Sequence, residues 1–572
     1  MCLFEDGRLR YALNEERLSR TKNHTGFPFL ALARLQSDCR VALADMDMVA
    51  LAGYCGMTVD VEERLWGSLF GSWFTRASRY DWLLANRFVG DAERLAYHPF
   101  RQVALRLRLR QLGYPGPVRF VEHHVAHAAT AYYSAPDDLK DGSAILTIDA
   151  AGDGVSATVS EPDRAGGLRR IAATPIYDSI GAFYQAITKL LGFRILRHEG
   201  KITGLAAYGD PTRLSSAFDG LFTLSEDGLR FRNRSRSFGE AMVATLRSRV
   251  GDASREDVAA AGQRLLEDVV AGHATAVCRR TGARHLLVAG GVFANVRLNQ
   301  RLHELPGVEG VFVFPHMGDG GLAVGAALHV LRRFDADLAL PGLYLGPEHG
   351  EDEIRRVLES SGFPFHRSED VEMEVAKRLA ARQVVARFAG RMEFGPRALG
   401  HRSVLYSAVD PAVNQWLNER LRRSEFMPFA PMTLAEEADR CYRGIGGSRR
   451  SASFMTMTFD CTPTMRAEAA GVVHVDGTAR PQCLAAADDP AGHRLLTLYR
   501  ELTGEHTLVN TSFNLHEEPI VGSPEDAVRS FAEARLDALA IGPFIVPRPV
   551  GTGGPGESSP PGWEPAGNGM GT

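Results

Sequence analysis

The strongest constraint on the fold of this chain is a repeated pattern in which an apolar strand runs into glycines and then into a helix. The stretch 285–302, HLLVAGGVFANVRLNQRL, has this order, and 310–331, GVFVFPHMGDGGLAVGAALHVL, repeats it directly afterwards. At 143–160, SAILTIDAAGDGVSATVS places a Gly/Asp turn between two apolar strands, which is a hairpin signal. Strands that lead into helices through glycine turns are typical of α/β proteins. The sequence therefore predicts an α/β fold.

The length of 572 residues is too great for one ordinary hydrophobic core, so two or three domains are expected. Proline, glycine and charge cluster at LPGLYLGPEHGED, residues 340–352, which is typical of a domain boundary. We predict a first domain over 1–345 and a smaller α/β domain over 352–548. The segment 549–572 is rich in Pro, Gly and Ser without apolar periodicity, which predicts a disordered tail.

Composition narrows the class of partners and the compartment. The net charge is −4 and no block of like charges stands out, which argues against a dedicated nucleic-acid binder. No apolar run approaches the length of a membrane span, and the N-terminus, MCLFEDGRLR, carries acidic residues where a signal peptide is apolar. Seven scattered cysteines without a CxxC pair indicate reduced thiols. We expect a cytoplasmic protein without a membrane or nucleic-acid partner.

Two histidines and two aspartates form a candidate metal set. His123 and His127, in VEHHVAHAATAYYSAP (121–136), are four positions apart and share one face of a predicted helix, while His124 points elsewhere. Asp149 and Asp319 each stand at a glycine-rich turn. Such a mixed nitrogen and oxygen set suits Fe(II), Mn(II) or Zn(II). The alternatives are a structural histidine pair, an ordinary β-turn at Asp149 and a helix cap at Asp319.

Two further stretches of the predicted first domain suit a small polar ligand. Gly290, Gly291 and Asn295 lie where a strand turns into a helix, a place suited to a nucleotide sugar or phosphate. The stretch 198–210, HEGKITGLAAYGD, reads as a loop with a carboxylate, Glu199, and a cation, Lys201, which is one of five lysines in the chain. The alternatives are close helix packing at the glycines and a solvated loop at 198–210.

The predicted second domain carries arginines interleaved with Gly, Pro and aromatic residues. Because arginine stays charged and can hold phosphate oxygens in pairs, these side chains predict an anion-binding cleft with neutral hydrogen bonds from Ser512 and Asn514. In an arginine-rich chain the alternative is that many of them are simply solvated. The candidate arginines are Arg397, Arg402, Arg422, Arg423 and Arg480.

In their order along the chain, these stretches resemble the ATP-dependent O-carbamoyltransferases of nodulation-factor and antibiotic biosynthesis. The resemblance covers about residues 5–545, and the order of the motifs makes it specific. The motifs are EERLSRTK (15–22), HHVAH (123–127), the Asp149 turn, EGKITGLAAYG (199–209), GGVFANVRL (290–298), GDGGLAVGAA (318–327), GRMEFGPRALGHRS (390–403), DGTARPQ (476–482) and NTSFN (510–514).

The resemblance implies an N-terminal ASKHA-type domain (actin-like, a duplicated ribonuclease-H-like fold), related to tRNA threonylcarbamoyl-transfer enzymes, and a smaller YrdC-like domain. The second domain is expected to make carbamoyl adenylate from carbamoyl phosphate and Mg-ATP. The first is expected to move the carbamoyl group to a hydroxyl of a small molecule, either an antibiotic or another secondary metabolite. A homodimer is one assembly left open.

The family also implies roles for the candidate residues. A divalent metal, Fe(II) in first place, would act as Lewis acid on the His/Asp set. The adenosine would lie near Gly290, Gly291 and Asn295. Residues matching the adenylate-forming site are Arg397, Arg402, Arg480, Ser512 and Asn514, with Arg422 and Arg423 beside them. The residues predicted to be catalytic are Lys201, Glu199, Arg397 and Arg402.

Two departures from the family pattern stand out. Many members have lysine at the position of Arg422. The family also begins with an apolar strand and a His-Asp-x-Ser-Ala loop that this sequence does not show, so CLFEDGRLRYAL (2–13) is expected to act as the first strand here. We expect upstream in-frame codons to encode the strand and loop; the alternative is a truncated, impaired enzyme. Two other readings stay open, a tRNA-modifying carbamoyl transferase and a non-catalytic nucleotide-binding module.

Overall fold

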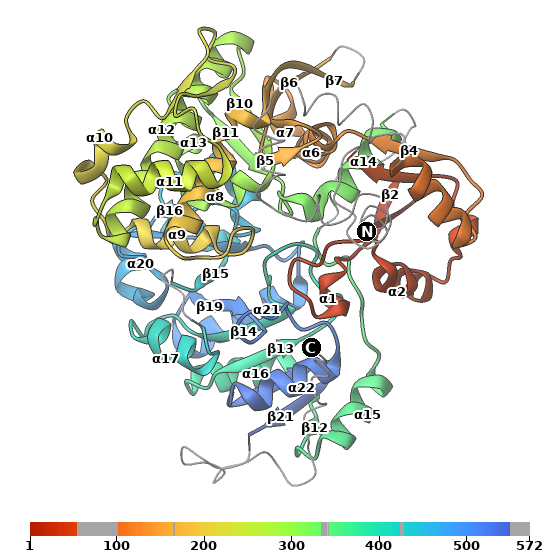
Figure 1. The fold of residues 1–572 in the computed structure, drawn as a ribbon. Helices are drawn as coiled ribbons and strands as arrows, with labels where there is room; N and C mark the ends of the chain where they lie inside the picture. The colour runs from red at the N-terminus through yellow and green to blue at the C-terminus, as the bar shows by residue number, and fades with distance from the viewer. Residues whose placement is uncertain (54–100, 164–165, 333–339, 341, 424–427, 549–572) are drawn as a thin grey trace. The chain divides into compact units, whose positions relative to one another are not determined.

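The computed structural model describes residues 1–53, 101–163, 166–332, 340, 342–423 and 428–548, so the predicted tail lies outside the described residues. The chain forms two compact units, and each consists of segments that are not continuous in sequence (Figure 1). The first unit comprises Met1–Glu15, Asn23–Pro341 and Ile445–Thr458; the second comprises Glu16–Lys22, Gly342–Gly444 and Phe459–Thr572.

A five-stranded sheet forms the centre of the first unit, in the order β11-β10-β5-β6-β7. The strands β5, β6 and β7 are antiparallel, whereas β10 runs parallel to both β5 and β11. The predicted hairpin is confirmed, and its turn has positive φ angles at Asp153 (48°) and Gly154 (78°). The strand bounds are β5 (Ser143–Gly152), β6 (Val155–Pro162), β7 (Leu168–Pro175), β10 (His285–Ala289) and β11 (Gly310–Val313).

Helices pack on this sheet and on one another. Helix α14 (Leu322–Leu331) lies so close to α6 (His123–Tyr133) that a Cβ atom on Gly325 would stand 2.0 Å from the Ala126 carbonyl oxygen. The long helix α12 (Arg255–Thr281) begins at an N-cap serine, ends at a left-handed glycine and packs against α8 and α9. The remaining helices of this group are α8 (Ile180–Leu190), α9 (Glu199–Ala206), α11 (Gly239–Val250) and α13 (Val296–His303).

The start of the chain contributes two small sheets to the first unit. CLFEDGRLRYAL folds as a hairpin of β1 (Cys2–Glu5) and β2 (Arg8–Ala12), and β3 (Val49–Ala52) pairs in parallel with β4 (Val118–Val121). Within the described residues β1 pairs with β2 and with no other strand. The predicted upstream loop stays a prediction.

The second unit is built on an eight-stranded mixed sheet, in the order β12-β21-β20-β13-β14-β19-β15-β18. Helices α16 (Val371–Ala380) and α21 (Pro490–Thr503) pack together and bury leucines against it. Both units thus combine sheets and helices, which confirms the predicted α/β fold class. The strands are β12 (His366–Arg367), β13 (Val385–Phe388), β14 (Arg402–Ser407), β15 (Ala430–Leu434), β18 (Gln482–Leu484), β19 (Thr507–Ser512), β20 (Ala538–Ile541) and β21 (Phe544–Pro547).

None of the helices in the described residues combines the length and the apolar character needed to cross a bilayer. The six cysteines in the described residues are all free thiols.

Candidate functional site

The predicted histidine helix forms as α6, directly after β4. Its N-cap is Glu122, whose carboxylate accepts the Val125 N–H at 2.7 Å. The rings of His123 and His127 lie on one face, 4.7 Å apart between centroids. His124 points into the core, where its Nδ1 lies 2.7 Å from the Thr147 hydroxyl, as its different helical face predicts.

The structure brings the four candidate metal ligands together. One ligand atom from each of His123, His127, Asp149 and Asp319 lies within 4.8 Å of all the others. The closest approaches are His127 Nε2 to Asp149 Oδ2, 3.3 Å, and His123 Nε2 to Asp319 Oδ1, 3.6 Å. Both Nε2 atoms are buried and have no hydrogen-bond partner among the described residues. Buried ring nitrogens left in this way fit a bound cation, which would satisfy them.

Glycines make room for this set and orient one of its carboxylates. The Gly291 N–H donates to Asp149 Oδ2 at 2.9 Å, and the Ala150 N–H donates to Oδ1 at 2.7 Å. A Cβ atom on Gly152 would stand 2.1 Å from the His123 ring, and one on Gly290 would stand 2.2 Å from a backbone oxygen. Gly290 also has a φ of 111°, which disfavours other residues. The two glycines predicted to face a nucleotide therefore also build the metal set.

The histidines and aspartates of this set shift one another's pKa values. Burial opposes protonation of His123, but Asp149 and Asp319 outweigh it and raise the pKa of His123 to about 9. Burial works against ionisation of Asp149, yet the two histidines hold the pKa of that carboxyl well below its ordinary value. In the absence of a metal ion a proton therefore partly neutralises the carboxylates, and a divalent cation would take its place.

The structure gives the remaining first-unit candidates defined local roles. Asn295 is the N-cap of α13, where its Oδ1 accepts the Leu298 N–H and its amide pairs with Gln263, so its polar atoms already have partners. The predicted loop around Glu199 and Lys201 is wrong, since both residues lie in helix α9, and Lys201 is buried. Small helix-compatible residues between the glycines allow this helix, and burial raises the pKa of Glu199.

In the second unit, the half-buried cations Arg397 and Arg480 lie close enough for the charge of one to act on the other. Burial lowers the pKa of Arg397 to about 10. Burial and the charge of Arg397 together hold the pKa of Arg480 well below its ordinary value. The Nε of Arg397 is buried without a hydrogen-bond partner, and Arg397 has no ion pair within the described residues. Two neighbouring cations, one of them with an unpartnered buried Nε, form a place suited to an anion.

Arg402 lies in a different environment from Arg397, although five positions separate them. Its side chain is fully buried, and its guanidinium lies 3.7 Å above the Phe388 ring. It donates to the carbonyl oxygens of Ala389 and Gly390, the latter at 3.0 Å. Arg402 therefore holds the loop that leads to Arg397, and a direct contact of Arg402 with a phosphate stays a prediction.

Of the other predicted residues of the second unit, three contact one another and one lies at the surface. Arg423 donates to the Ser512 carbonyl at 2.6 Å and to Asn514 Oδ1 at 2.9 Å, so these three predicted residues lie together. Arg422 is 66% exposed and lies 3.8 Å from the Glu533 carboxylate. The structure thus brings Arg423, Ser512 and Asn514 into one group and leaves Arg422 at the surface.

Two features of the second unit were missed from the sequence. Glu393 accepts three backbone N–H groups, from Leu399, His401 and Arg402, at 2.8 to 3.0 Å, and so fixes the loop around Arg397. A glutamate just before a Gly-Pro-Arg turn is a signal that could have indicated this anchor.

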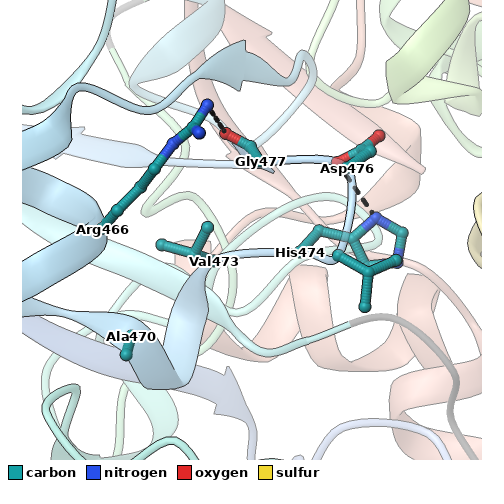
Figure 2. A pocket seen from close by; sticks show the side chains of 7 residues that line it. Arg466, Ala470, Val473, His474, Asp476 and Gly477 are labelled. Carbon is teal, nitrogen blue, oxygen red and sulfur yellow. Dashed lines mark hydrogen bonds and ion pairs between the residues drawn. The ribbon is translucent and has the colours of Figure 1, made fainter.

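The second missed feature is a pocket of 370 Å³ beside the turn that precedes Arg480 (Figure 2). In that turn Asp476 Oδ1 accepts the Thr478 N–H at 3.0 Å and lies 3.2 Å from His474 Nδ1. These contacts fix the conformation of the turn that precedes Arg480. The lining residues are Arg466, Ala470, Val473, His474, Val475, Asp476 and Gly477.

Fold and site together define an α/β protein of two units, with a candidate His/Asp metal site in one and a half-buried arginine pair in the other. Family models identify the class of protein. The N-terminal model of the carbamoyltransferase family matches residues 1–328, and its C-terminal model matches residues 376–548. The chain belongs to the carbamoyltransferase family, which confirms the predicted resemblance and the prediction of a transferase enzyme.

Several relatives are similar over most of the chain. The nodulation protein NolNO of Sinorhizobium fredii is 30% identical over 563 residues, covering 95% of this chain and 78% of the relative. An uncharacterized protein of Synechocystis is also 30% identical and covers 95% of this chain and 94% of its own length. A structure of full-length HypF in its phosphate- and nucleotide-bound form has 17% identity over 41% of this chain and 38% of that chain, with a TM-score of 0.26.

Proposed function

We propose that this protein is an O-carbamoyltransferase that makes carbamoyl adenylate in its second unit and transfers the carbamoyl group to a hydroxyl of a small molecule in its first. Membership of the carbamoyltransferase family and the nodulation relatives support the overall reaction. The observation that carries the proposal is the pair of buried imidazole nitrogens without hydrogen-bond partners, facing Asp149 and Asp319.

The first unit would carry out the transfer. His123, His127, Asp149 and Asp319 would hold a divalent ion, with Fe(II), Mn(II) and Zn(II) all compatible with this donor set. A bound ion would supply a Lewis acid that neutralises charge on the adenylate. The backbone N–H groups of Gly291 and Ala150 fix the Asp149 carboxylate, so the ligand geometry is set before the ion arrives.

The second unit would activate the carbamoyl group. Water hydrolyses carbamoyl phosphate to carbamate and inorganic phosphate, and a carbamate oxygen then bonds to the α-phosphorus of Mg-ATP while the bond to pyrophosphate breaks. The product is a mixed anhydride with AMP as leaving group. Arg397 and Arg480, two neighbouring half-buried cations, are suited to neutralise the phosphates in this step.

The hydroxyl acceptor is proposed to be an antibiotic or another secondary metabolite. The nodulation proteins among the relatives support a small molecule as acceptor. The net charge of −4 favours a small molecule over tRNA.

ATP–pyrophosphate exchange tests the activation step. We expect exchange of labelled pyrophosphate into ATP that depends on carbamoyl phosphate, with acetyl phosphate as the matched control. Exchange at the same rate with and without carbamoyl phosphate, or no exchange by the folded protein, would overturn the proposal. Transfer is tested separately with protein treated with a chelator and reloaded anaerobically with Fe(II), Mn(II) or Zn(II).

A further inference from the structure

Two short segments each pack in one unit although the residues on both sides of them in sequence belong to the other unit. Residues 445–458 stand in sequence between Gly444 and Phe459 of the second unit, yet they pack in the first unit. Residues 16–22 stand between Glu15 and Asn23 of the first unit, yet they pack in the second. Each unit is therefore completed by a segment that the neighbouring sequence does not supply.

The 445–458 segment covers an edge of the first unit's central sheet. Strand β11 is the edge strand, and its Val311 and Val313 N–H groups donate to the hydroxyls of Ser448 (3.2 Å) and Ser451 (3.1 Å). The Ser451 hydroxyl in turn donates to the Val311 carbonyl at 2.9 Å. Side-chain hydroxyls thus take the place of a further strand and satisfy the open edge.

The other end of this segment reaches the turn beside the metal set. Asn299 is fully buried, and its Nδ2 donates to the carbonyl oxygens of Thr456 and Phe293, both at 2.7 Å. Phe293 lies in the short 3₁₀ turn Gly291–Ala294. The first residue of that turn donates its N–H to Asp149 Oδ2. One asparagine therefore links the 445–458 segment to the turn that orients a metal-set carboxylate.

The 16–22 segment makes a comparable contact in the second unit. Arg17 is 5% exposed, and its guanidinium donates to the Gly395 carbonyl at 2.7 Å. Gly395 has a φ of 132° and lies two residues before Arg397. Arg20, in the same segment, donates instead to the carbonyls of Pro519 (2.8 Å) and Ile520 (2.7 Å). Arg17 therefore holds the loop that presents Arg397.

We propose that the two segments are positioning elements, one for each site. The 445–458 segment sets the Gly291–Ala294 turn through Asn299, and the 16–22 segment sets the Arg397 loop through Arg17. Asn299 and Arg17 touch neither ion nor substrate and act through Asp149 and Arg397. The inference rests on the proposed function for the meaning of the two sites, and it predicts that each segment affects one site only.

The test compares two variants of the full chain in two assays. For Asn299→Leu we expect about 10-fold or greater loss of Mn²⁺ affinity by calorimetry, in line with the loss when a partner of a metal ligand is removed. Its ATP–pyrophosphate exchange should stay within about twofold of the wild type, because the chemistry lies in the other unit. For Arg17→Met we expect the reverse, with exchange reduced about 10-fold and Mn²⁺ affinity unchanged.

Matched controls separate positioning from general stability. Asn233→Leu removes two Nδ2 bonds to the carbonyls of Tyr177 and Ser237 in the same unit, and it should leave Mn²⁺ affinity unchanged. Arg20→Met removes carbonyl contacts of the same 16–22 segment away from the Arg397 loop, and it should reduce exchange less than Arg17→Met. Equal effects of a variant and its control, or loss of both activities in one variant, would overturn the proposal.

Two further outcomes keep the test decisive. If Asn299→Leu does not fold, Ser448→Ala combined with Ser451→Ala loosens the same segment with less disturbance, and the same separation of Mn²⁺ binding from exchange is expected. Wild-type protein that binds no Mn²⁺ contradicts the metal set of the proposed function and this inference with it. Normal wild-type binding that neither Asn299→Leu nor the double variant weakens contradicts the positioning role alone.

Discussion

The two candidate sites hold charges of opposite sign. In the first unit two imidazole nitrogens without hydrogen-bond partners face two carboxylates, so the site is suited to a cation. In the second unit the half-buried Arg397 and Arg480 lie near each other, so the site is suited to an anion. Removing charged groups from water costs free energy, which a ligand of the opposite charge would offset. The comparison supports the proposal that the two units carry out different steps of one reaction.

The sites also differ in how their side chains are held. Backbone N–H groups at Gly291 and Ala150 orient Asp149, and Gly152 leaves room for the His123 ring. In the second unit a buried side chain, Glu393, ties the loop around Arg397 together. The first site therefore depends on glycines at turns, and the second depends on buried charged side chains.

The largest effect is expected from a metal ligand. His123→Ala should reduce carbamoyl transfer by roughly a thousandfold, because a lost Lewis acid removes several kcal/mol of stabilisation of the transition state. ATP–pyrophosphate exchange by the same variant should persist, since the residues proposed to catalyse exchange lie in the second unit. Both activities are measured on one preparation. Loss of exchange in a folded His123→Ala protein would contradict the division between the sites.

The next effect concerns the anion site. Arg397→Ala should reduce carbamoyl adenylate formation about 10- to 100-fold, because a charge-assisted hydrogen bond contributes about 1.5–3 kcal/mol. Carbamoyl adenylate supplied from outside should still be used for transfer. Arg422→Ala is the control, as its side chain is largely exposed, and it should lose less activity. Parental adenylate formation by Arg397→Ala would show that the site is misassigned.

A stability comparison sharpens the contrast between Arg397 and Arg402. Arg402→Met removes the fully buried donor to the Ala389 and Gly390 carbonyls and should lower the free energy of unfolding by roughly 1–3 kcal/mol. Arg397→Met removes a half-buried cation that has no ion pair within the described residues, so its urea midpoint should equal or exceed that of the wild type. Equal destabilisation by both would mean that Arg397 is also a structural residue.

The smallest effect is a difference in acid sensitivity between the units. Burial lowers the pKa of His273 in the first unit from 6.5 to about 4, while its Nδ1 donates to the Gly228 carbonyl. As pH falls, the His273 imidazole therefore takes up a proton in the unfolded chain before it does so in the folded protein. Its contribution to stability is complete above pH 6.5 and is lost as pH falls toward 4, with about 2 kcal/mol lost at pH 5. In the second unit burial opposes ionisation of Asp489, but His401 and Arg387 lower its pKa to about 2, so its contribution is lost only below pH 4.

Urea unfolding of the wild type and of His273→Asn between pH 4.5 and 7.5 measures the first of these contributions. The asparagine keeps a donor near Gly228 and cannot take up a proton, so the variant should lose less stability than the wild type as pH falls. Parallel curves for the two proteins would show that His273 is not responsible.

The sequence alone determined the features that depend on local pattern. The helical spacing of His123 and His127, the hairpin turn after Asp149 and the strand–glycine–helix order all follow from periodicity and turn chemistry within a few residues. The order of the motifs along the chain also indicated the carbamoyltransferase family, which the family models confirm.

Only the tertiary structure decided which side chains are buried and what they contact. Arg397 and Arg402 come from one short motif, yet the Arg402 guanidinium stacks on the Phe388 ring while Arg397 has no ion pair among the described residues. The packing of residues 16–22 in the second unit and of residues 445–458 in the first could not be predicted from the sequence either. The physical reason is that burial and hydrogen-bond partners depend on segments hundreds of positions away, such as Gly395 for Arg17, and no local pattern records them.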